Sequence, residues 1–338
     1  MAHDPTRPAP TSTAQVGARP DPLRPPPGDP TTLADGLAPG AGSGTVATAP
    51  VLGPDCWFLS GPTAAGKSDL AVELARELGA EVLSVDSMAV YRGLDVGTAK
   101  PTPDQRRAVP HHLLDLVAPA EPFSVARWLA AAAAAVADVR SRGRRILFVG
   151  GTPLYLRALR DGLASLPPAD PDSRAALTAE AARLGPAALH ARLAEIDPAA
   201  AARIHPHDLK RIVRALEVAA ATGRPLSAAF APEPHPVFDA QLLVVDLPRR
   251  LLRERIDRRV ERMFAAGLVE ETAAALAAPG GIGPTARQAA GYAEAIDLLA
   301  DRIDRAEAIR RTQARTRQLA KRQLTWLRGF ARAIWLAV

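Results

Sequence analysis

Cysteine is almost absent from this chain: Cys56 is the only one in 338 residues. A single cysteine excludes an internal disulfide and a cysteine-cluster zinc site, and it fits a reducing compartment, so we expect a cytoplasmic protein. Long uninterrupted apolar segments are also missing, although 48% of the residues are hydrophobic, which argues against a membrane protein. The length allows one large or two medium domains, and we expect the chain to act as a monomer.

Acidic residues are fewer than basic ones, with 36 Asp and Glu against 42 Lys and Arg, which gives a net charge of +6 and an isoelectric point near 10.0. This excess permits an anionic partner. It does not demand one, because modest basicity is often only a solvated surface.

Residues 1–52 lack aromatic side chains and periodicity, and they are rich in Pro, Gly, Thr and Ala. This composition predicts a disordered tail without a catalytic role. A targeting peptide is the alternative interpretation. The segment has no apolar core and carries acidic residues, so it suits neither export nor organelle import: Asp4, Asp21, Asp29 and Asp35.

The stretch "GPTAAGKS" at 61–68 matches the G-x-x-x-x-G-K-[S/T] pattern of a phosphate-binding loop. It follows an apolar run, "CWFLS" at 56–60, and precedes residues with helical periodicity, so we expect a strand, the loop and then a helix. Glycines at 61 and 66 leave backbone N–H groups able to face phosphate oxygens at the positive end of the helix. A chance glycine turn is the weaker interpretation.

Strand-like and helix-like stretches alternate from residue 55 onward, which predicts an α/β fold with a P-loop NTPase-like parallel sheet wrapped by helices. Strand signals disappear between about 170 and 235, and "AQLLVVDL" at 240–247 then resumes the sheet. We therefore expect a catalytic core formed by 53–168 and 238–338, with basic C-terminal helices. Residues 169–237 are expected to form a helical insertion domain.

Two strand ends distinguish this chain from an ordinary nucleotide hydrolase. The strand "ILFVG" runs into Gly150, Gly151 and Thr152 instead of the acidic residue that helps to hold the metal in such enzymes. Meanwhile "EVLSVD" at 81–86 places Asp86 at the carboxyl end of its strand, where the fold would bring it close to the phosphate loop. A carboxylate there suits a base that acts on an incoming nucleophile. It could also only cap the segment that follows.

A series of motifs, in order, resembles those of the bacterial tRNA dimethylallyltransferases and covers the chain from about 55 to 336. The motifs are "GPTAAGKS", "SVDSMAVYRGLDVGTAKP" at 84–101, "HHLLDL" at 111–116, "VGGTPLYLRAL" at 149–159, "ARIHPHDLKRIVRALEV" at 202–218, "RQAAGY" at 287–292 and "RQLAKRQLTWLRG" at 317–329. The resemblance implies transfer of a dimethylallyl group from dimethylallyl diphosphate to N6 of the adenosine 3′ to the anticodon, tRNA position 37, with release of diphosphate. It implies Mg²⁺ as the cofactor and the anticodon stem-loop of tRNA as the partner.

Such a reaction poses two chemical problems, and each has candidate residues. Negative charge develops on the departing diphosphate, and the loop N–H groups, Lys67 and a magnesium ion near Ser68 could stabilise it. The adenine amine is a poor nucleophile, so a carboxylate within hydrogen-bond distance could accept its proton, and Asp86 is the candidate. Thr63 matches the family position shared between the donor and acceptor sites, and we count it with Asp86 and Lys67 as catalytic.

The donor site is expected to comprise the whole loop and one arginine: Gly61, Pro62, Thr63, Ala64, Ala65, Gly66, Lys67, Ser68 and Arg255. Arg249 and Arg255 match recurrent family arginines, and Arg255 is the one expected to reach the diphosphate. A solvated helix face explains both arginines nearly as well.

For tRNA, the family's contact blocks and two further residues correspond to the following positions: Asp86, Ser87, Met88, Ala89, Thr152, Arg174, Lys210, Arg211, Ile212, Val213, Arg214, Arg287, Gln288, Ala289, Ala290, Gly291 and Tyr292. Thr152 precedes Pro153 and is also a predicted helix N-cap. Basic residues gather on the helices around 210–214 and 310–322, where they could neutralise RNA phosphates or form solvated faces. Ala89 departs from the family, which commonly has Gln there, so a polar contact to tRNA is in doubt.

Three other functions stay open from the residues alone. A small-molecule phosphotransferase would use the same loop and strand-end carboxylate, but it gives no reason for the insertion and the basic helices. A prenyltransferase that acts on free adenine nucleotides would share the core. A non-catalytic RNA-binding module would bind tRNA without consuming the prenyl donor.

Overall fold

A parallel six-stranded sheet of order β3-β2-β4-β1-β5-β6 forms the centre of the protein. The structure is a computed structural model, and it describes residues 50–163, 166–167, 170–229, 238 and 241–338. The strands are β1 (Cys56–Ser60), β2 (Ala80–Ser84), β3 (His111–His112), β4 (Arg145–Val149), β5 (Leu242–Asp246) and β6 (Ile334–Ala337). Every strand pair is parallel, which confirms the predicted α/β class.

Strand β1 shows why both faces of the sheet are covered, because all five of its residues are buried. Phe58 packs in one hydrophobic cluster, whereas its neighbours Trp57 and Leu59 pack in another. Successive side chains of a strand point to opposite faces, so a run that is apolar at every position needs a layer on each side.

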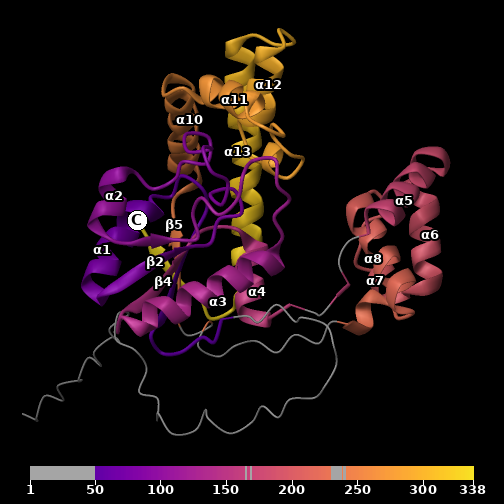
Figure 1. Cartoon of the computed structure of the whole chain (residues 1–338), viewed down its shortest axis with the longest axis horizontal. Coiled ribbons are helices and arrows are strands. Elements are labelled where there is room, and N and C mark those ends of the chain that lie inside the picture. The colour runs from indigo at the N-terminus through magenta and orange to yellow at the C-terminus, as the bar shows by residue number, and fades with distance from the viewer. Residues whose placement is uncertain (1–49, 164–165, 168–169, 230–237, 239–240) are drawn as a thin grey trace, which may run out of the picture.

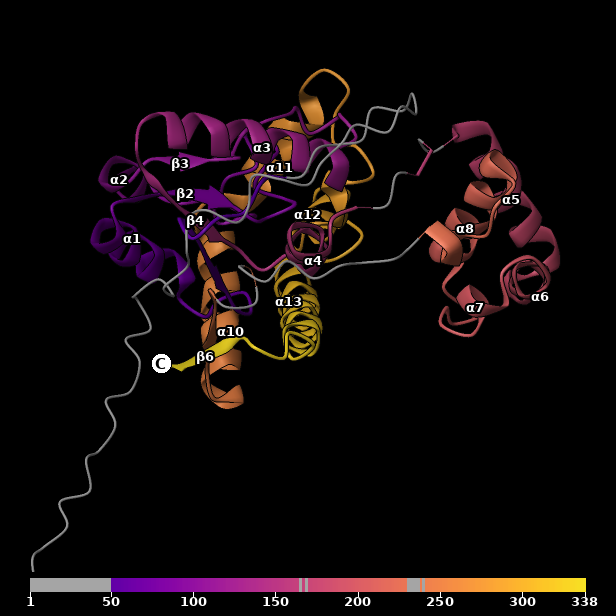
Figure 2. The ribbon, with the colours of Figure 1, turned by 90° about the horizontal axis from the view of Figure 1, so that it is seen from below.

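Helices from distant parts of the sequence supply these two layers (Figures 1 and 2). The cluster around Phe58 includes residues of α3 (Val125–Ser141) and α4 (Pro153–Asp161), and the cluster around Trp57 includes residues of α1 (Lys67–Leu78). Helices α10 (Arg249–Ala265) and α13 (Arg305–Leu327) contribute to both. The short α2 (Pro103–Ala108) contacts α1.

The predicted helical stretch after the fourth strand is present as α5 (Pro171–Leu184), α6 (Pro186–Ile196), α7 (Pro198–Ala201), α8 (Leu209–Thr222) and the 3-10 turn η1 (Leu226–Ala229). These elements share a core of their own that includes Leu189, Leu193, Ile212 and Leu216. Figure 1 shows them as a group apart from the sheet. The expected tRNA contact of this group stays a prediction.

The C-terminal part is largely helical, as expected, and contains α11 (Leu268–Ala277), η2 (Ala286–Gln288) and α12 (Tyr292–Leu299) beside α10 and α13. Strand β6 was not anticipated. Residues 1–49 of the predicted tail lie outside the described residues. In the part that the structure describes, no helix combines the length and the apolar character needed to cross a membrane.

Candidate active site

The phosphate loop connects the carboxyl end of β1 to the first turn of α1. Three of its residues have positive φ angles: Gly61 at 147°, Ala64 at 65° and Gly66, the N-cap of α1, at 93°. A Cβ at Gly61 would lie 2.9 Å from the Val245 carbonyl oxygen on β5, so the loop crosses close to the neighbouring strand. This backbone, at the positive end of a helix, is suited to surround an anion.

Lys67 lies in this loop with its ammonium turned inward. Its Nζ donates hydrogen bonds to the carbonyl oxygens of Gly61 at 3.0 Å and Pro62 at 2.8 Å. Burial and the nearby Arg259 guanidinium lower the pKa of Lys67 to about 8, and the Asp86 carboxylate opposes that shift. The ammonium is therefore in a setting where a phosphate anion would stabilise its charge.

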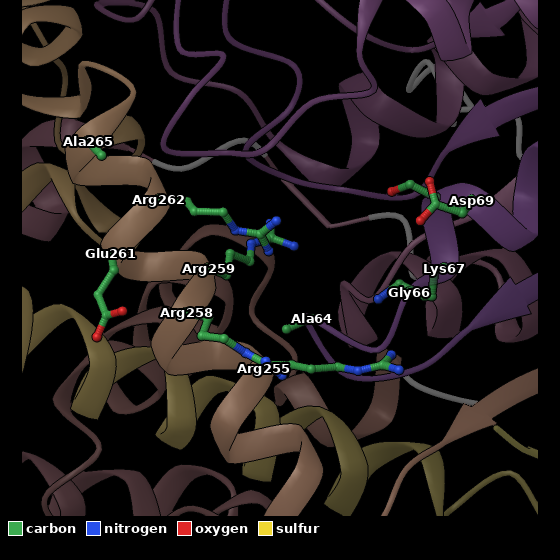
Figure 3. A pocket seen from close by; sticks show the side chains of 11 residues that line it. Ala64, Gly66, Lys67, Asp69, Arg255, Arg258, Arg259, Glu261, Arg262 and Ala265 are labelled. Carbon is green, nitrogen blue, oxygen red and sulfur yellow. The ribbon is translucent and has the colours of Figure 1, made fainter.

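Helix α10 faces the loop across a cavity of about 730 Å³ that we call the phosphate cavity (Figure 3). Four arginines of α10 line this cavity, and we call them the arginine stripe: Arg255, Arg258, Arg259 and Arg262. Arg255 Nη1 donates to the Ala65 carbonyl oxygen at 3.4 Å, so the sequence-predicted arginine does reach the loop. No ion pair within the described residues engages these four guanidinium groups, and their charge is available to an anionic ligand.

The other three arginines of this stripe were missed by the sequence analysis. Arg259 has the most constrained setting, because burial lowers its pKa while Asp86 opposes the shift. The spacing of arginines at 255, 258, 259 and 262 on one helix face was the available signal. Arg249, singled out with Arg255, does not line the phosphate cavity but a separate groove between α10 and α13.

Asp86 follows β2 at the carboxyl edge of the sheet. Its Oδ1 accepts hydrogen bonds from the backbone N–H of Met88 at 2.7 Å and of Ala89 at 3.3 Å, so it does cap the following turn. Among the described residues, no hydrogen bond engages Oδ2. One oxygen therefore fixes the carboxylate, and the other can accept a proton.

Thr152 stands beside Asp86 because the turns after β2 and β4 touch. A Cβ on Gly150 would lie 2.2 Å from the Val85 carbonyl oxygen, which only glycine avoids. Thr152 is the N-cap residue of α4 by position, as predicted, but its side chain makes no capping hydrogen bond. Its Oγ1 instead accepts from the Ser87 N–H at 3.0 Å and so joins the two turns.

Gln323 of α13 ties the phosphate loop to these turns. Its Oε1 accepts from the Thr63 N–H at 2.8 Å, and its Nε2 donates to the Gly151 carbonyl oxygen at 2.8 Å. Gln323 was not among the site residues predicted from the sequence. Gln323 lies at a buried position of α13 beside Ala320 and Leu324, and a glutamine at such a position was the signal that could have found it.

Three cavities meet at these residues. A central cavity of about 100 Å³ shares Lys67, Ser68 and Arg259 with the phosphate cavity. A further cavity of about 320 Å³, which we call the α13 cavity, shares six residues with the central one: Thr63, Asp86, Thr98, Gly151, Arg259 and Gln323. Asp86 and Thr63 line the central cavity and therefore stand between the phosphate cavity on one side and the α13 cavity on the other.

The α13 cavity gathers several residues predicted to contact tRNA: Asp86, Ser87, Met88, Thr152, Gln288, Ala289 and Ala290. Ala89 is buried and lines the central cavity. Arg315 and Arg322 of α13 also line the α13 cavity, and Arg315 Nη2 donates to the Gln288 carbonyl oxygen at 2.9 Å.

The other residues of the predicted 287–292 contact block, Arg287, Gly291 and Tyr292, do not line the α13 cavity. Arg287 is exposed and Gly291 has a φ of 102°. Tyr292 is fully buried, and its hydroxyl donates to Glu271 Oε1 at 2.6 Å. Its side chain therefore supports the wall of the cavity from behind.

The predicted tRNA residues on α8 also include both exposed and buried side chains. Lys210 and Arg211 are exposed, whereas Ile212 and Val213 are buried in the core of the helical group. Glu217 is buried and pairs with both Arg174 and Arg214, at 2.7 Å and 3.3 Å, so these two guanidinium groups are partly neutralised.

The basic residues of α13 likewise do not form one free face. Arg310 and Arg311 both pair with Glu307, at 2.6 Å each, and Arg317 pairs with Asp257. The two pairs of Glu307 are exposed, so they are weak and could exchange for RNA phosphates, whereas the Arg317–Asp257 pair is half-buried.

Ser68 is the residue expected to hold a magnesium ion. It is exposed, lines the phosphate cavity beside Asp69, and its hydroxyl has no hydrogen-bond partner among the described residues. The described residues contain no group of three or more His, Cys, Asp or Glu side chains placed to hold a metal. A hydroxyl next to a phosphate loop still fits Mg²⁺, because this ion keeps several waters and binds mainly through substrate phosphates.

A phosphate loop on a parallel sheet, faced by an arginine stripe and a strand-end carboxylate, defines a P-loop protein with a site for group transfer from a phosphorylated donor. Comparison with known proteins identifies the family. The chain matches the IPP transferase family model over residues 89–330 and the isopentenyl transferase model over residues 54–115. The protein therefore belongs to the IPP transferase family.

Relatives and solved structures agree with this assignment. The chain is 54% identical to the tRNA dimethylallyltransferase of Anaeromyxobacter dehalogenans strain 2CP-C, over 83% of this chain and 94% of the relative. It is 47% identical to that of Geobacter metallireducens, over 82% and 91%. Its fold resembles the crystal structure of the tRNA isopentenylpyrophosphate transferase of Bacillus halodurans, with a TM-score of 0.60, 39% identity and coverage of 83% and 89%. A eukaryotic dimethylallyltransferase acting on tRNA gives a TM-score of 0.67 at 26% identity, over 83% and 73%.

Proposed function

We propose that the protein transfers a dimethylallyl group from dimethylallyl diphosphate to N6 of the adenosine 3′ to the anticodon of tRNA, and releases diphosphate. The observation that carries this proposal is the position of Asp86, which lines both the central cavity beside the phosphate loop and the α13 cavity. A base located there could act on an amine that enters from one side while a donor is held by its diphosphate from the other. The names of the relatives support tRNA as the acceptor.

The donor's diphosphate would bind in the phosphate cavity. The loop N–H groups and Lys67 lie on one side of this cavity, and Arg255 and Arg259 lie on the other. As the C–O bond of the allyl group breaks, the electron pair leaves with the diphosphate, and these fixed charges stabilise it. A magnesium ion at Ser68 would add positive charge to the same leaving group.

The acceptor adenine would enter the α13 cavity after it swings out of the anticodon loop. Its N6 forms the new bond to the allyl carbon and loses one proton, which Asp86 Oδ2 accepts. Oδ1 stays bonded to the N–H groups of Met88 and Ala89, so the carboxylate keeps its orientation during the step.

The recognition of tRNA would begin outside this cavity. Lys210 and Arg211 are exposed on α8, and Arg287 is exposed beside the cavity wall, so each could contact an RNA phosphate. We further propose that the protein acts as a monomer. A cytoplasmic location would place it with its tRNA substrate.

The first prediction tests the base. Asp86→Asn keeps the size and one acceptor oxygen but removes basicity, so single-turnover transfer should slow by about 10²- to 10⁴-fold while donor binding survives. The assay uses excess protein, an anticodon stem-loop RNA and labelled dimethylallyl diphosphate. Asp246→Asn is the matched control, because Asp246 is an exposed strand-end carboxylate that lines none of the three cavities. A rate within about threefold of wild type, well below a general-base effect, would show that Asp86 only caps its turn.

A further inference from the structure

Glu271 on α11 is not among the residues assigned to the transfer, yet it is bonded to the backbone of the loop 94–101. Its Oε2 accepts hydrogen bonds from the N–H groups of Asp95 and Val96, both at 2.7 Å. Its Oε1 accepts from the Gly97 N–H at 3.1 Å. Hydrogen bonds to an ionised acceptor are about twice as strong as neutral ones, so these three contacts fix this part of the loop firmly.

The same carboxylate also accepts the hydroxyl hydrogen of Tyr292 at 2.6 Å. Tyr292 is fully buried, and its ring lies against Gly97, where a Cβ would come within 2.5 Å of the ring. Burial and the adjacent Glu271 raise the pKa of Tyr292 far above its usual range, so the hydroxyl stays a donor. Glu271 and Tyr292 therefore hold the loop by both hydrogen bonds and packing.

The loop forms a wall of the proposed reaction site. Gly97 and Thr98 line the α13 cavity, and Thr98 and Ala99 line the central cavity with Asp86. The far end of the loop is anchored by Lys100, whose Nζ donates to the Tyr91 carbonyl oxygen and Asp95 Oδ1, each at 2.6 Å. Glu271 anchors the loop at residues 95–97. A change of Glu271 would therefore move the cavity wall that faces Asp86.

The carboxylate also connects two walls of the α13 cavity. Tyr292 begins α12, one residue after the segment 288–290, which also lines this cavity. Through Glu271, the 95–98 wall and the 288–290 wall share one anchoring point. A shift of either wall would change the width of the space in which the adenine must meet the allyl carbon.

We propose that Glu271 is a positioning residue for the transfer, because its carboxylate fixes the 95–98 wall and Tyr292 and thereby sets the distance between the adenine amine and the donor carbon. This inference rests on the proposed function. It predicts that loss of the carboxylate slows the transfer step and leaves RNA affinity unchanged, since the exposed cations that would meet RNA phosphates are not bonded to Glu271.

A matched pair of variants tests the proposal. Glu271→Gln places an amide NH₂ against backbone N–H groups, so the wall should shift. Glu270→Gln removes an equal charge from the same first turn of α11, but Glu270 is exposed and forms no hydrogen bond or ion pair within the described residues. It therefore controls for the helix dipole.

The measurements are single-turnover transfer to an anticodon stem-loop RNA from labelled dimethylallyl diphosphate, and the dissociation constant of that RNA. Glu271→Gln should slow transfer by about 10- to 100-fold, because a displacement of about 1 Å costs up to about 10²-fold. Glu270→Gln should match wild type in both measurements.

The possible outcomes separate this inference from the proposed function. If wild type transfers nothing, the proposed function and this inference both fall. If wild type is active and the two variants have equal rates, or if Glu271→Gln weakens RNA binding without slowing transfer, Glu271 does not position the reactants. If Glu271→Gln fails to fold, Gly97→Ala tests the proposal instead, because the added Cβ pushes the same wall away from Tyr292. Slower transfer by Gly97→Ala with unchanged RNA affinity supports the proposal. A wild-type transfer rate overturns it.

Discussion

At the scale of single residues, the site depends on polar groups that do two things at once. Asp86 caps a turn with one oxygen and offers the other to a ligand, so the two interpretations of this residue from sequence are compatible. The sequence predicted the phosphate loop and Asp86 because glycine spacing and a strand end are local features. Arg259 and Gln323 could not be placed in the same way, because their contacts reach the site from helices far along the chain.

The pKa of Lys67 leads to a prediction at this scale. The lysine must be charged to stabilise the leaving diphosphate, and its pKa is lowered to about 8 by burial and by Arg259. A lysine loses its charge as pH rises through its pKa, so kcat/KM for the donor should fall above about pH 8.

The control is Lys67→Arg, whose guanidinium stays charged throughout this range. This variant should be slower overall, because its geometry differs, but it should not lose activity as the pH passes the same point. Measurement of kcat/KM against pH for both proteins decides. An identical alkaline decline in the two would assign that titration to another group.

At the scale of elements, long apolar runs and strong helical periodicity were sufficient to predict most of the fold. β1, β4 and β5 lie where expected because strands covered on both faces have continuous apolar sequences. β3 has only two residues, so it has no recognisable pattern, whereas the apolar run Ile334–Ala337 of β6 was present in the sequence and was not predicted as a strand. The basic stretch of α13 was identified as a helix, and the pairs of Arg310 and Arg311 with Glu307 are local contacts one turn apart on that helix. The pair of Arg317 with Asp257 of α10 depends on a tertiary contact, so the sequence alone could not predict it.

Helix α8 carries the prediction for tRNA binding. Lys210→Ala combined with Arg211→Ala removes two exposed cations and leaves the buried face of the helix intact. RNA affinity should fall, and the slope of log K against log salt should become shallower by about 0.7 to 0.9 for each RNA phosphate that the variant no longer neutralises. Donor affinity should not change. Titrations of the anticodon stem-loop at several salt concentrations measure both quantities.

A double variant with the same charge change controls for the effect of net charge. Arg144→Ala with Arg145→Ala removes two exposed arginines at the amino end of β4, the opposite edge of the sheet from Asp86. An equal decrease of the slope in both double variants would mean that α8 is only a solvated face.

At the scale of the whole molecule, segments from both sides of the helical stretch 171–229 build one site. The loop after β1 and the turns after β2 and β4 come from the first part of the chain, and α10 and α13 come from the last. The first fifty residues have a low-complexity composition without aromatic side chains, which predicts no catalytic role. A variant that starts near Val51 should therefore retain full turnover with the anticodon stem-loop RNA, whereas a large loss in a folded variant would show that the tail takes part.

The central claim is that this protein prenylates tRNA, and mass spectrometry of tRNA tests it most directly. The tRNA is incubated with the protein, Mg²⁺ and dimethylallyl diphosphate, then digested to nucleosides and to fragments that locate the modification. We predict a gain of one C₅H₈ unit on the adenosine 3′ to the anticodon, with the group on N6, and a strongly reduced initial rate with Asp86→Asn. Unmodified tRNA in a reaction where the same protein prenylates AMP, or phosphorylates a small molecule with ATP, would contradict the account.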